Sequence, residues 1–321
     1  MSNSISLNGV SVVIPTIDRA EVLIDTLKDI INQDFVNYEI IVIDQSDEIN
    51  FKAIEFLDSS KITCRYFNAH FKGLPQARNF GLKQASKDII LYIDDDIRCE
   101  KDLIRNHYQA HLSHEADLVA GGITEKGDIA NDKVAGYFNK WTATAVSNFS
   151  STVSGRCSHG KGCNFSIKKR ALFKVGGVDE LLNIGAALYE ESELALRLEK
   201  AGYKAWFEPK AHLIHLAAPM GGCRVIKDWP KYMYGLGHNR AILVFRHLSP
   251  IYWPTALIRT LLLGISYSRL DKSIKPFISV VKGLNHGRKA ARLRPLNTDL
   301  SGEEILMKEA QIIRSQSCDT V

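Results

Sequence analysis

The stretch Asp88-Ile-Ile-Leu-Tyr-Ile-Asp-Asp-Asp96 joins a run of strand-forming apolar residues to three consecutive carboxylates. The run over residues 89–93 is typical of a buried strand. Because adjacent carboxylates repel one another and burial increases that repulsion, the strand must end at Asp94. The three carboxylates are tolerable in a cleft where a divalent cation and phosphates neutralise them. Taken alone, the triplet fits a solvated acidic turn equally well.

Apolar strand-like runs alternate with helical patterns on the N-terminal side of this stretch. The expected strands cover residues 10–14, 38–43 and 62–67, and the expected helices begin near Asp18, Phe51 and Pro75. This alternation predicts βαβ crossovers and a largely parallel sheet. Ligands of such sheets bind beyond the carboxyl ends of the strands. Pro15, Thr16, Asp44 and the acidic triplet all follow strands, so we expect them to share one edge.

The chain after the triplet continues the pattern less regularly. A helix is expected over 101–112, a strand over 117–121, a strand over 160–167, a helix over 189–201, and two short strands over 203–207 and 211–215. Residues 123–158 are rich in Gly, Ser, Thr and Asn and show little periodicity. Long irregular segments inside a compact domain tend to be binding loops.

Composition and charge indicate an ordinary globular protein. The chain has 321 residues, of which 45% are hydrophobic and 24% charged, as in ordinary globular proteins. Its net charge of +5 is mild and does not indicate nucleic-acid binding. The N-terminal residues lack the pattern of a signal peptide, and the six cysteines lack a CxxC pair, so we expect reduced thiols in the cytoplasm. Cys157, His159 and Cys163 are close in sequence, but no fourth ligand completes a metal clip.

The character of the sequence changes near residue 220. Residues 227–294 mix aromatic, aliphatic and basic side chains, which suits helices lying on an anionic membrane surface. A helical cap with a solvated basic face is the alternative. Pro254 and Arg259 interrupt the most apolar segment, 251–267, which is therefore a poor transmembrane span.

These observations predict three parts. An α/β domain is expected over 1–220, with one half at about 8–121 and the other at about 122–220. A helical, basic and aromatic extension follows over 221–296, and a polar tail over 297–321.

Several motifs occur in a characteristic order along residues 8–216. They are the strand ends at Pro15-Thr16 and Asp44, the segment Gly73-Leu-Pro-Gln-Ala-Arg-Asn79, the acidic triplet, Gly162-Cys-Asn164, Glu190-Glu191 and His215. In this order the chain resembles the family 2 glycosyltransferases, inverting enzymes of the GT-A fold. The resemblance implies a Rossmann-like, mostly parallel central sheet flanked by helices. It also implies Mn²⁺ or Mg²⁺ as a cofactor and a nucleotide-sugar donor. Residues 1–220 would then be the catalytic domain, with a nucleotide-binding half at about 8–121 and an acceptor half at about 122–220.

The resemblance assigns roles residue by residue. Those implied for nucleotide binding are Pro15, Thr16, Asp44, Arg78 and Asp94, and those implied for the metal are Asp96 and His215. Glu191 matches the general base, although the family usually has an aspartate there. Glu190 is the rival, and favourable electrostatics at a helix start explain both acids without any function.

Three further residues carry alternatives. Arg19 contacts the diphosphate or simply sits in an exposed helix turn. Trp141, with Tyr137, stacks on an acceptor sugar or only fixes its loop. Asp95 is expected to be exposed or to support the other two carboxylates rather than to bind a ligand directly.

The sequence therefore predicts a metal-dependent inverting glycosyltransferase. It would transfer a sugar from a UDP- or dTDP-sugar to a hydroxyl of a glycan or lipid-linked acceptor, in surface polysaccharide assembly. The expected location is the cytoplasm or the cytoplasmic membrane face. The alternatives are a binding module without catalysis and a sugar nucleotidyltransferase. The segment 13–18 contains no glycine, which disfavours a nucleotidyltransferase and a nicotinamide dehydrogenase.

Overall fold

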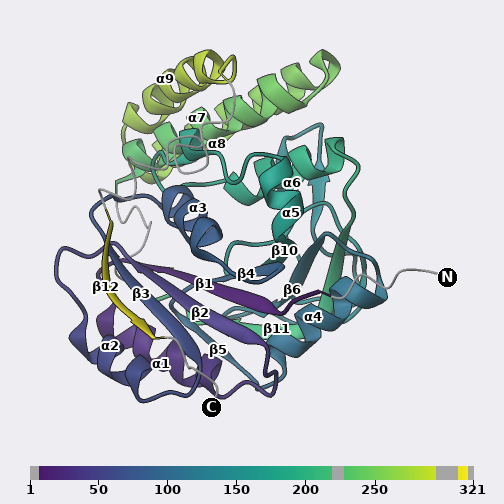
Figure 1. Ribbon diagram of the computed structural model, residues 1–321. Coiled ribbons are helices and arrows are strands. Elements are labelled where there is room, and N and C mark those ends of the chain that lie inside the picture. The colour runs from purple at the N-terminus through teal and green to yellow at the C-terminus, as the bar shows by residue number, and fades with distance from the viewer. Residues whose placement is uncertain (1–6, 219–227, 294–309, 317–321) are drawn as a thin grey trace.

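The computed structural model describes residues 7–218 and 228–293 and the backbone of 310–316. Its first half is a run of βα units (Figure 1). The elements are β1 (Val10–Thr16), α1 (Ala20–Ile31), β2 (Tyr38–Asp44), α2 (Phe51–Asp58), β3 (Thr63–Ala69), α3 (Leu74–Gln84) and β4 (Ile89–Ile93). The strands β3, β2, β1 and β4 are neighbours in that order and run parallel.

The second half extends the sheet with mixed strand directions. Its elements are β5 (Ile97–Cys99), α4 (Leu103–Ser113), β6 (Leu118–Thr124), β7 (Tyr137–Asn139), β8 (Thr144–Val146), β9 (Gly155–Arg156), β10 (Asn164–Lys168), α5 (Lys169–Lys174), a 3₁₀ turn (Glu180–Leu182), α6 (Glu190–Lys200) and β11 (Ala205–His215). β10 lies antiparallel between β4 and β6. The prediction of two strands over 203–215 is wrong, because β11 is one strand with a register shift between Glu208 and Leu213.

Apolar strands produce the buried layer. Every residue of β1, β2 and β4 is buried, because helices cover both faces of the sheet. Figure 1 shows α1 and α2 on one face and α3 and α6 on the other. In the parallel register Thr16 lies beside Asp44, and β4, on the other side of β1, ends at Ile93. The polar residues that follow these strands therefore share one edge, as expected.

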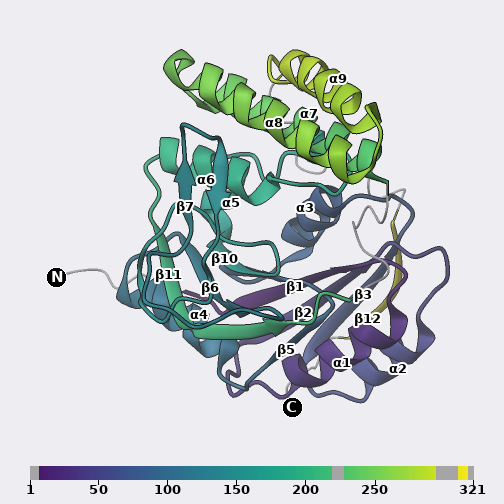
Figure 2. The same cartoon turned by 180° about the vertical axis from the view of Figure 1, so that it is seen from behind.

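Residues 229–290 are largely helical, as expected of the extension. They form α7 (Trp229–His247), a 3₁₀ turn (Pro250–Tyr252), α8 (Trp253–Leu270) and α9 (Lys275–Ala290). Figures 1 and 2 show these helices as a layer beyond α3 and α6, away from the sheet. Within the described residues, every helix is too short or too polar to cross a bilayer.

The C-terminal segment contributes one further strand. β12 (Ala310–Gln316) pairs antiparallel with β3 at the edge of the sheet. This strand was not expected within the polar tail. The remaining residues of that tail, 297–309 and 317–321, lie outside the described residues, as do residues 1–6 and 219–227.

Candidate functional site

The acidic triplet lies at the carboxyl edge of the sheet, directly after β4. Asp95 is buried there, and its Oδ2 accepts a hydrogen bond from Thr16 Oγ1 at 2.5 Å. Arg19, which precedes α1, places Nη1 2.7 Å from Asp95 Oδ1 and 3.1 Å from Asp96 Oδ2. Asp95 is therefore enclosed rather than exposed, and it fixes the first βα turn against the triplet.

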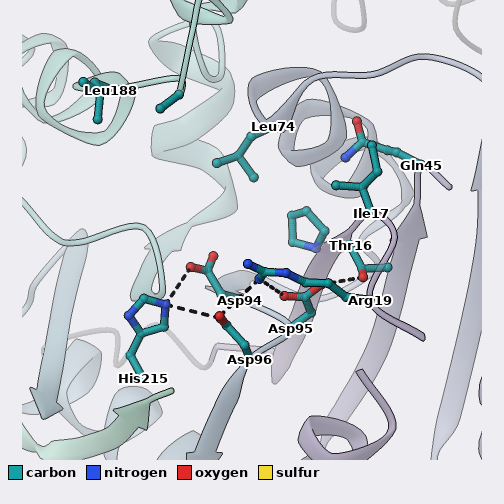
Figure 3. Close-up of a pocket in the computed structure, with 12 residues that line it drawn as sticks. Thr16, Ile17, Arg19, Gln45, Leu74, Asp94, Asp95, Asp96, Leu188 and His215 are labelled. Atoms are coloured by element: carbon teal, nitrogen blue, oxygen red, sulfur yellow. Dashed lines mark hydrogen bonds and ion pairs between the residues drawn. The ribbon is translucent and has the colours of Figure 1, made fainter. Parts of the chain in front are cut away.

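Asp94 and Asp96 face His215, the last residue of β11 (Figure 3). The His215 Nε2 atom lies 3.2 Å from Asp96 Oδ1 and 3.7 Å from Asp94 Oδ2. On the other side of the ring, Nδ1 lies 2.6 Å from Glu125 Oε1. Lys161 Nζ in turn lies 2.6 Å from Glu125 Oε2. The imidazole is thus oriented by a carboxylate behind it, and Nε2 points toward the triplet.

Burial and neighbouring charges shift the pKa values of this cluster. Burial raises the pKa of Asp94, and the negative charges of Asp96 and Glu191 add to that effect. Burial also raises the pKa of Asp95, to about 6. For Asp96 burial acts in the same direction, but hydrogen bonding to His215 outweighs it and lowers the pKa. Burial acts to lower the pKa of His215, but hydrogen bonds to Asp96 and Glu125 raise it to about 9.

The residues present fit a divalent cation. Ligand atoms of Asp94, Cys163 and His215 all lie within 4.8 Å of one another, and Asp96 Oδ1 is 3.2 Å from the imidazole. Ligands about 2.1 Å from one ion are separated by roughly 3 Å, so small adjustments bring these atoms to bonding distance. Carboxylate donors suit Mn²⁺ and Mg²⁺, and an imidazole binds a metal in its neutral form. Cys157 and His159 lie outside this group.

The two adjacent glutamates at the start of α6 have different surroundings. Glu190 is fully buried and forms an ion pair with Arg78 Nη1. Arg78 Nη2 donates to the Gly162 carbonyl at 2.9 Å and lies 4.0 Å from Asp94 Oδ1. Glu191 is only partly buried, and a methyl group at Gly162 would collide with its Oε1 atom. Arg78 and Glu190 therefore form the support of the site, while Glu191 keeps access to solvent.

The loop that leads into α6 has a strained backbone. Gly185, Ala187 and Tyr189 all have positive φ angles, of 65°, 48° and 71°. Non-glycine residues seldom adopt this conformation, so surrounding contacts must hold it. Asn239 of α7 supplies such contacts, because its Nδ2 donates to the carbonyls of Leu182 and Leu188 at 2.9 Å each.

α7 approaches this loop closely at two more points. Gly235 packs against the backbone of Gly185, where a side chain would collide with the Ile184 carbonyl. The buried Arg240 guanidinium lies 5.7 Å from the centre of the Tyr189 ring and donates to the Thr142 carbonyl. α7, the first helix of the extension, thus holds the loop that leads directly to Glu190 and Glu191.

A cavity of about 320 Å³ opens above the triplet. Its lining residues are Pro15, Thr16, Ile17, Arg19, Gln45, Leu74, Asp94, Asp95, Asp96, Ala186, Leu188 and His215. Figure 3 shows Arg19 and Thr16 on one side of the triplet and His215 on the other. Asp44 does not line this cavity. It accepts hydrogen bonds from Tyr66 and Ser46 and faces a neighbouring hollow, of which Arg19 forms the shared wall.

Trp141 is the predicted site residue that the structure places elsewhere. It is 53% exposed and packs edge to face on Tyr252, at the start of the outer helices. Sequence reasoning missed Glu125 and Leu188, and it weighed Cys163 only as part of a metal clip with Cys157 and His159. Glu125 directly follows β6, but the expected strand stopped at residue 121. Extending that strand to its observed end would have placed Glu125 on the same edge as the triplet.

Comparison with known proteins identifies the family. The sequence pattern described as "Glycosyl transferase family 2" matches residues 11–172, half of the chain. The chain belongs to this family. The family expected from the ordered motifs is therefore confirmed.

Two relatives in this family are similar over part of the chain. The GalNAc(5)-diNAcBac-PP-undecaprenol beta-1,3-glucosyltransferase of Campylobacter jejuni is 29% identical over 149 residues, 46% of this chain and 42% of that protein. The UDP-Glc:alpha-D-GlcNAc-diphosphoundecaprenol beta-1,3-glucosyltransferase WfgD of Escherichia coli is 33% identical over 90 residues, 27% of this chain and 34% of that protein. The matched regions thus span less than half of each relative.

Solved structures of glycosyltransferases share the fold. GalNAc-T7 with UDP, GalNAc and Mn²⁺ gives a TM-score of 0.60 at 16% identity, covering 91% of this chain and 59% of that chain. Residues 1–349 of Staphylococcus aureus TarS give 0.56 at 14% identity, covering 92% and 88%. The predicted GT-A architecture is thereby confirmed at the level of the fold.

Proposed function

We propose that this protein is a metal-dependent inverting glycosyltransferase. It transfers a sugar from a nucleoside-diphosphate donor to a hydroxyl of a glycan or lipid-linked acceptor. The observation that carries the proposal is the arrangement around one cavity edge. Asp94, Asp96 and His215 face one another there, and Glu191 is close enough for its charge to influence Asp94.

The donor half of the site has a positive charge where a diphosphate needs one. Arg19 lines both the cavity above the triplet and the hollow that contains Asp44. A nucleotide spanning both spaces would place its diphosphate beside Arg19 and its base or ribose near Asp44. The triplet and His215 would hold Mn²⁺ or Mg²⁺, which supplies positive charge for the leaving diphosphate.

The acceptor half contains the base. Glu191 accepts the proton of the acceptor hydroxyl as that oxygen attacks the anomeric carbon. Direct displacement inverts the anomeric configuration and needs no covalent intermediate. The buried pair of Arg78 and Glu190 lies beside this site, with Arg78 Nη2 4.0 Å from Asp94 Oδ1. Leu188 and Ala186, on the loop held by α7, form the wall on the acceptor side.

A UDP- or dTDP-sugar is the favoured donor, and the name of the Escherichia coli relative, which includes UDP-Glc, supports the uridine nucleotide. Both relatives' names include a diphosphate-linked undecaprenol, which supports a lipid-linked acceptor here. Surface polysaccharide assembly at the cytoplasmic face of a membrane is the corresponding role. The protein would be peripheral there and would use the basic extension.

A thermal-shift screen with UDP, dTDP, GDP and CMP, with and without Mn²⁺, tests the donor site. A ligand at 100 times its Kd stabilises a protein by about 2.7 kcal/mol, which raises Tm by several degrees. We expect UDP or dTDP to do so, with a further rise in Mn²⁺ that Asp96→Asn removes. Absence of a response to all four nucleotides would contradict the proposal.

Turnover separates the enzyme from the two alternatives. We expect slow hydrolysis of the nucleotide-sugar in Mn²⁺ that EDTA abolishes. A binding module would be stabilised by nucleotide without hydrolysis, and a nucleotidyltransferase would release pyrophosphate from a nucleoside triphosphate and a sugar phosphate. Either result would replace the proposed reaction.

A further inference from the structure

The outermost helices carry large aliphatic side chains on their solvent-facing sides. On α8 these are Ile258, Leu262 and Ile265, and along α9 they are Ile274, Ile278 and Val281. Both sets follow the spacing i, i+4, i+7, which places each set on one helical face. Their exposed fractions range from 38% to 67%. We call these six residues the outer aliphatic face.

The two stripes meet at the turn between the helices. Ile265 and Ile274 line one shallow hollow together with Phe277 and Arg269. The outer aliphatic face is therefore continuous from α8 to α9. Figures 1 and 2 place these helices at the end of the molecule farthest from the sheet.

The inward-facing sides of the same helices combine glycines with apolar side chains, among them Leu261, Leu263, Tyr267 and Val280. Gly264 of α8 packs on the side chain of Val280, and Gly283 and Gly287 of α9 approach the backbone of α7 at Tyr234 and His238. An ordinary surface helix turns its large apolar side chains toward the core. Here α8 and α9 pack one apolar side inward and expose a second, so internal packing does not account for the outer aliphatic face.

Basic side chains surround this face. The exposed cations of α8, α9 and their flanks are Arg259, Arg269, Lys272, Lys275, Lys282, Arg288, Lys289 and Arg292. Between residues 229 and 293 the sequence has one acid, Asp271. A second copy of this chain would bring like charges together, whereas an anionic lipid surface would neutralise them.

We propose that the outer aliphatic face and its basic rim dock the protein onto an anionic lipid bilayer. The two helices lie in the interface with their aliphatic side chains among the acyl chains and their cations at the headgroups. The inference deepens the proposed function, on which it rests for the lipid-linked acceptor. It also identifies the helices that make the contact: α8 and α9, with α7 buried between them and the site.

Vesicle co-sedimentation of the full chain tests the docking. We expect binding to vesicles in which about a third of the lipid is phosphatidylglycerol, weaker binding to pure phosphatidylcholine, and loss of binding at high salt. Leu262→Glu and the double variant Lys275→Glu/Lys282→Glu should each weaken partitioning at least tenfold. The matched controls are Ile129→Glu, an 82% exposed isoleucine elsewhere, and Lys133→Glu/Lys174→Glu. These controls should bind like the wild type.

Three outcomes would overturn the inference. They are no binding of the wild type to anionic vesicles, equal binding of Leu262→Glu and Ile129→Glu, and a wild-type dimer in light scattering that Leu262→Glu converts to monomer without changing vesicle binding. The docking and the catalysis are separable. Glu191→Gln should bind vesicles normally, and Leu262→Glu should keep nucleotide-sugar hydrolysis in Mn²⁺. Hydrolysis missing from the wild type, with vesicle binding that still depends on Leu262, would remove the proposed function and leave the docking.

Discussion

α7 and α8 are consecutive helices of similar length and similar residue types, yet they are used in opposite ways. α7 directs its polar groups inward, where Asn239 donates to the loop before α6 and Arg240 contacts Tyr189 at the end of that loop. α8 directs Thr260 and Gly264 inward and exposes Ile258 and Leu262. A mixture of aromatic, aliphatic and basic residues therefore does not by itself tell whether a helix is packed inside the protein or exposed at its surface. The partners of each side chain decide its role.

The end of α7 also directs charged groups inward, where they form buried ion pairs. Arg246 Nη1 lies 2.5 Å from Asp179 Oδ2 and 3.2 Å from Glu193 Oε1, and His247 Nε2 lies 2.8 Å from the same Glu193 oxygen. Glu193 is fully buried on α6, two residues after Glu191. α7 is therefore connected to α6 both through the loop that precedes α6 and through the first turn of α6.

Among the polar side chains of the two helices, the largest effect should come from Arg246→Met. Breaking a buried ion pair costs about 3–5 kcal/mol, and because Glu193 keeps Arg197 and His247 we expect about 3 kcal/mol here. Urea unfolding measures the change. Arg259→Met on α8, an exposed position, should change stability by less than about 0.5 kcal/mol. Equal effects of the two substitutions would remove the distinction between the helices.

An intermediate effect is expected from Asn239→Ala. Removing the amide leaves the carbonyls of Leu182 and Leu188 without this donor, which costs about 2 kcal/mol. Because the loop precedes Glu191, sugar transfer should fall more than nucleotide affinity does. Unfolding and steady-state kinetics measure the two consequences. Asn285→Ala, an exposed position on α9, is the matched control. Transfer that is unchanged in Asn239→Ala would show that α7 does not position the loop.

The smallest effect is expected from Leu262→Ala on α8. The side chain is 49% exposed, so its truncation should change the free energy of unfolding by less than about 0.5 kcal/mol. Leu243→Ala on α7 is the same substitution at a fully buried position, and we expect a cost of about 2–5 kcal/mol. The pair is compared by urea unfolding without lipid. A large cost at Leu262 would mean that α8 is packed against something in solution.

Much of the fold could be predicted because the residues next to a strand end mark it in the sequence. Pro15 and Thr16, Asp44 and the triplet each follow an apolar run, and parallel pairing then brings them to one edge. The order of the motifs along the chain then indicated the protein family. The bulge in β11 could not be predicted, because Pro209 and Lys210 read as a break between two strands although pairing with β6 continues beyond them.

The sequence predicted which residues belong to the site better than it predicted which of them contact one another. Asp94, Asp96 and His215 meet as expected, although their roles stay predictions. The pairing of Arg78 with Glu190 joins residues 112 positions apart, and nothing local specifies it. Because of this pairing Glu190 is buried against Arg78, while the neighbouring Glu191 keeps an accessible carboxylate. The sequence alone offered only the motif position to choose between them.

In the proposed reaction Glu191 removes the acceptor proton above a cation site formed by the triplet and His215. Glu191→Gln keeps the shape and removes the base, so transfer to the acceptor should fall by about 10²- to 10⁴-fold. The thermal shift with UDP and Mn²⁺ should be unchanged. Glu199→Gln, an exposed glutamate on the same helix, should transfer sugar at the wild-type rate. Full transfer by Glu191→Gln would contradict the account.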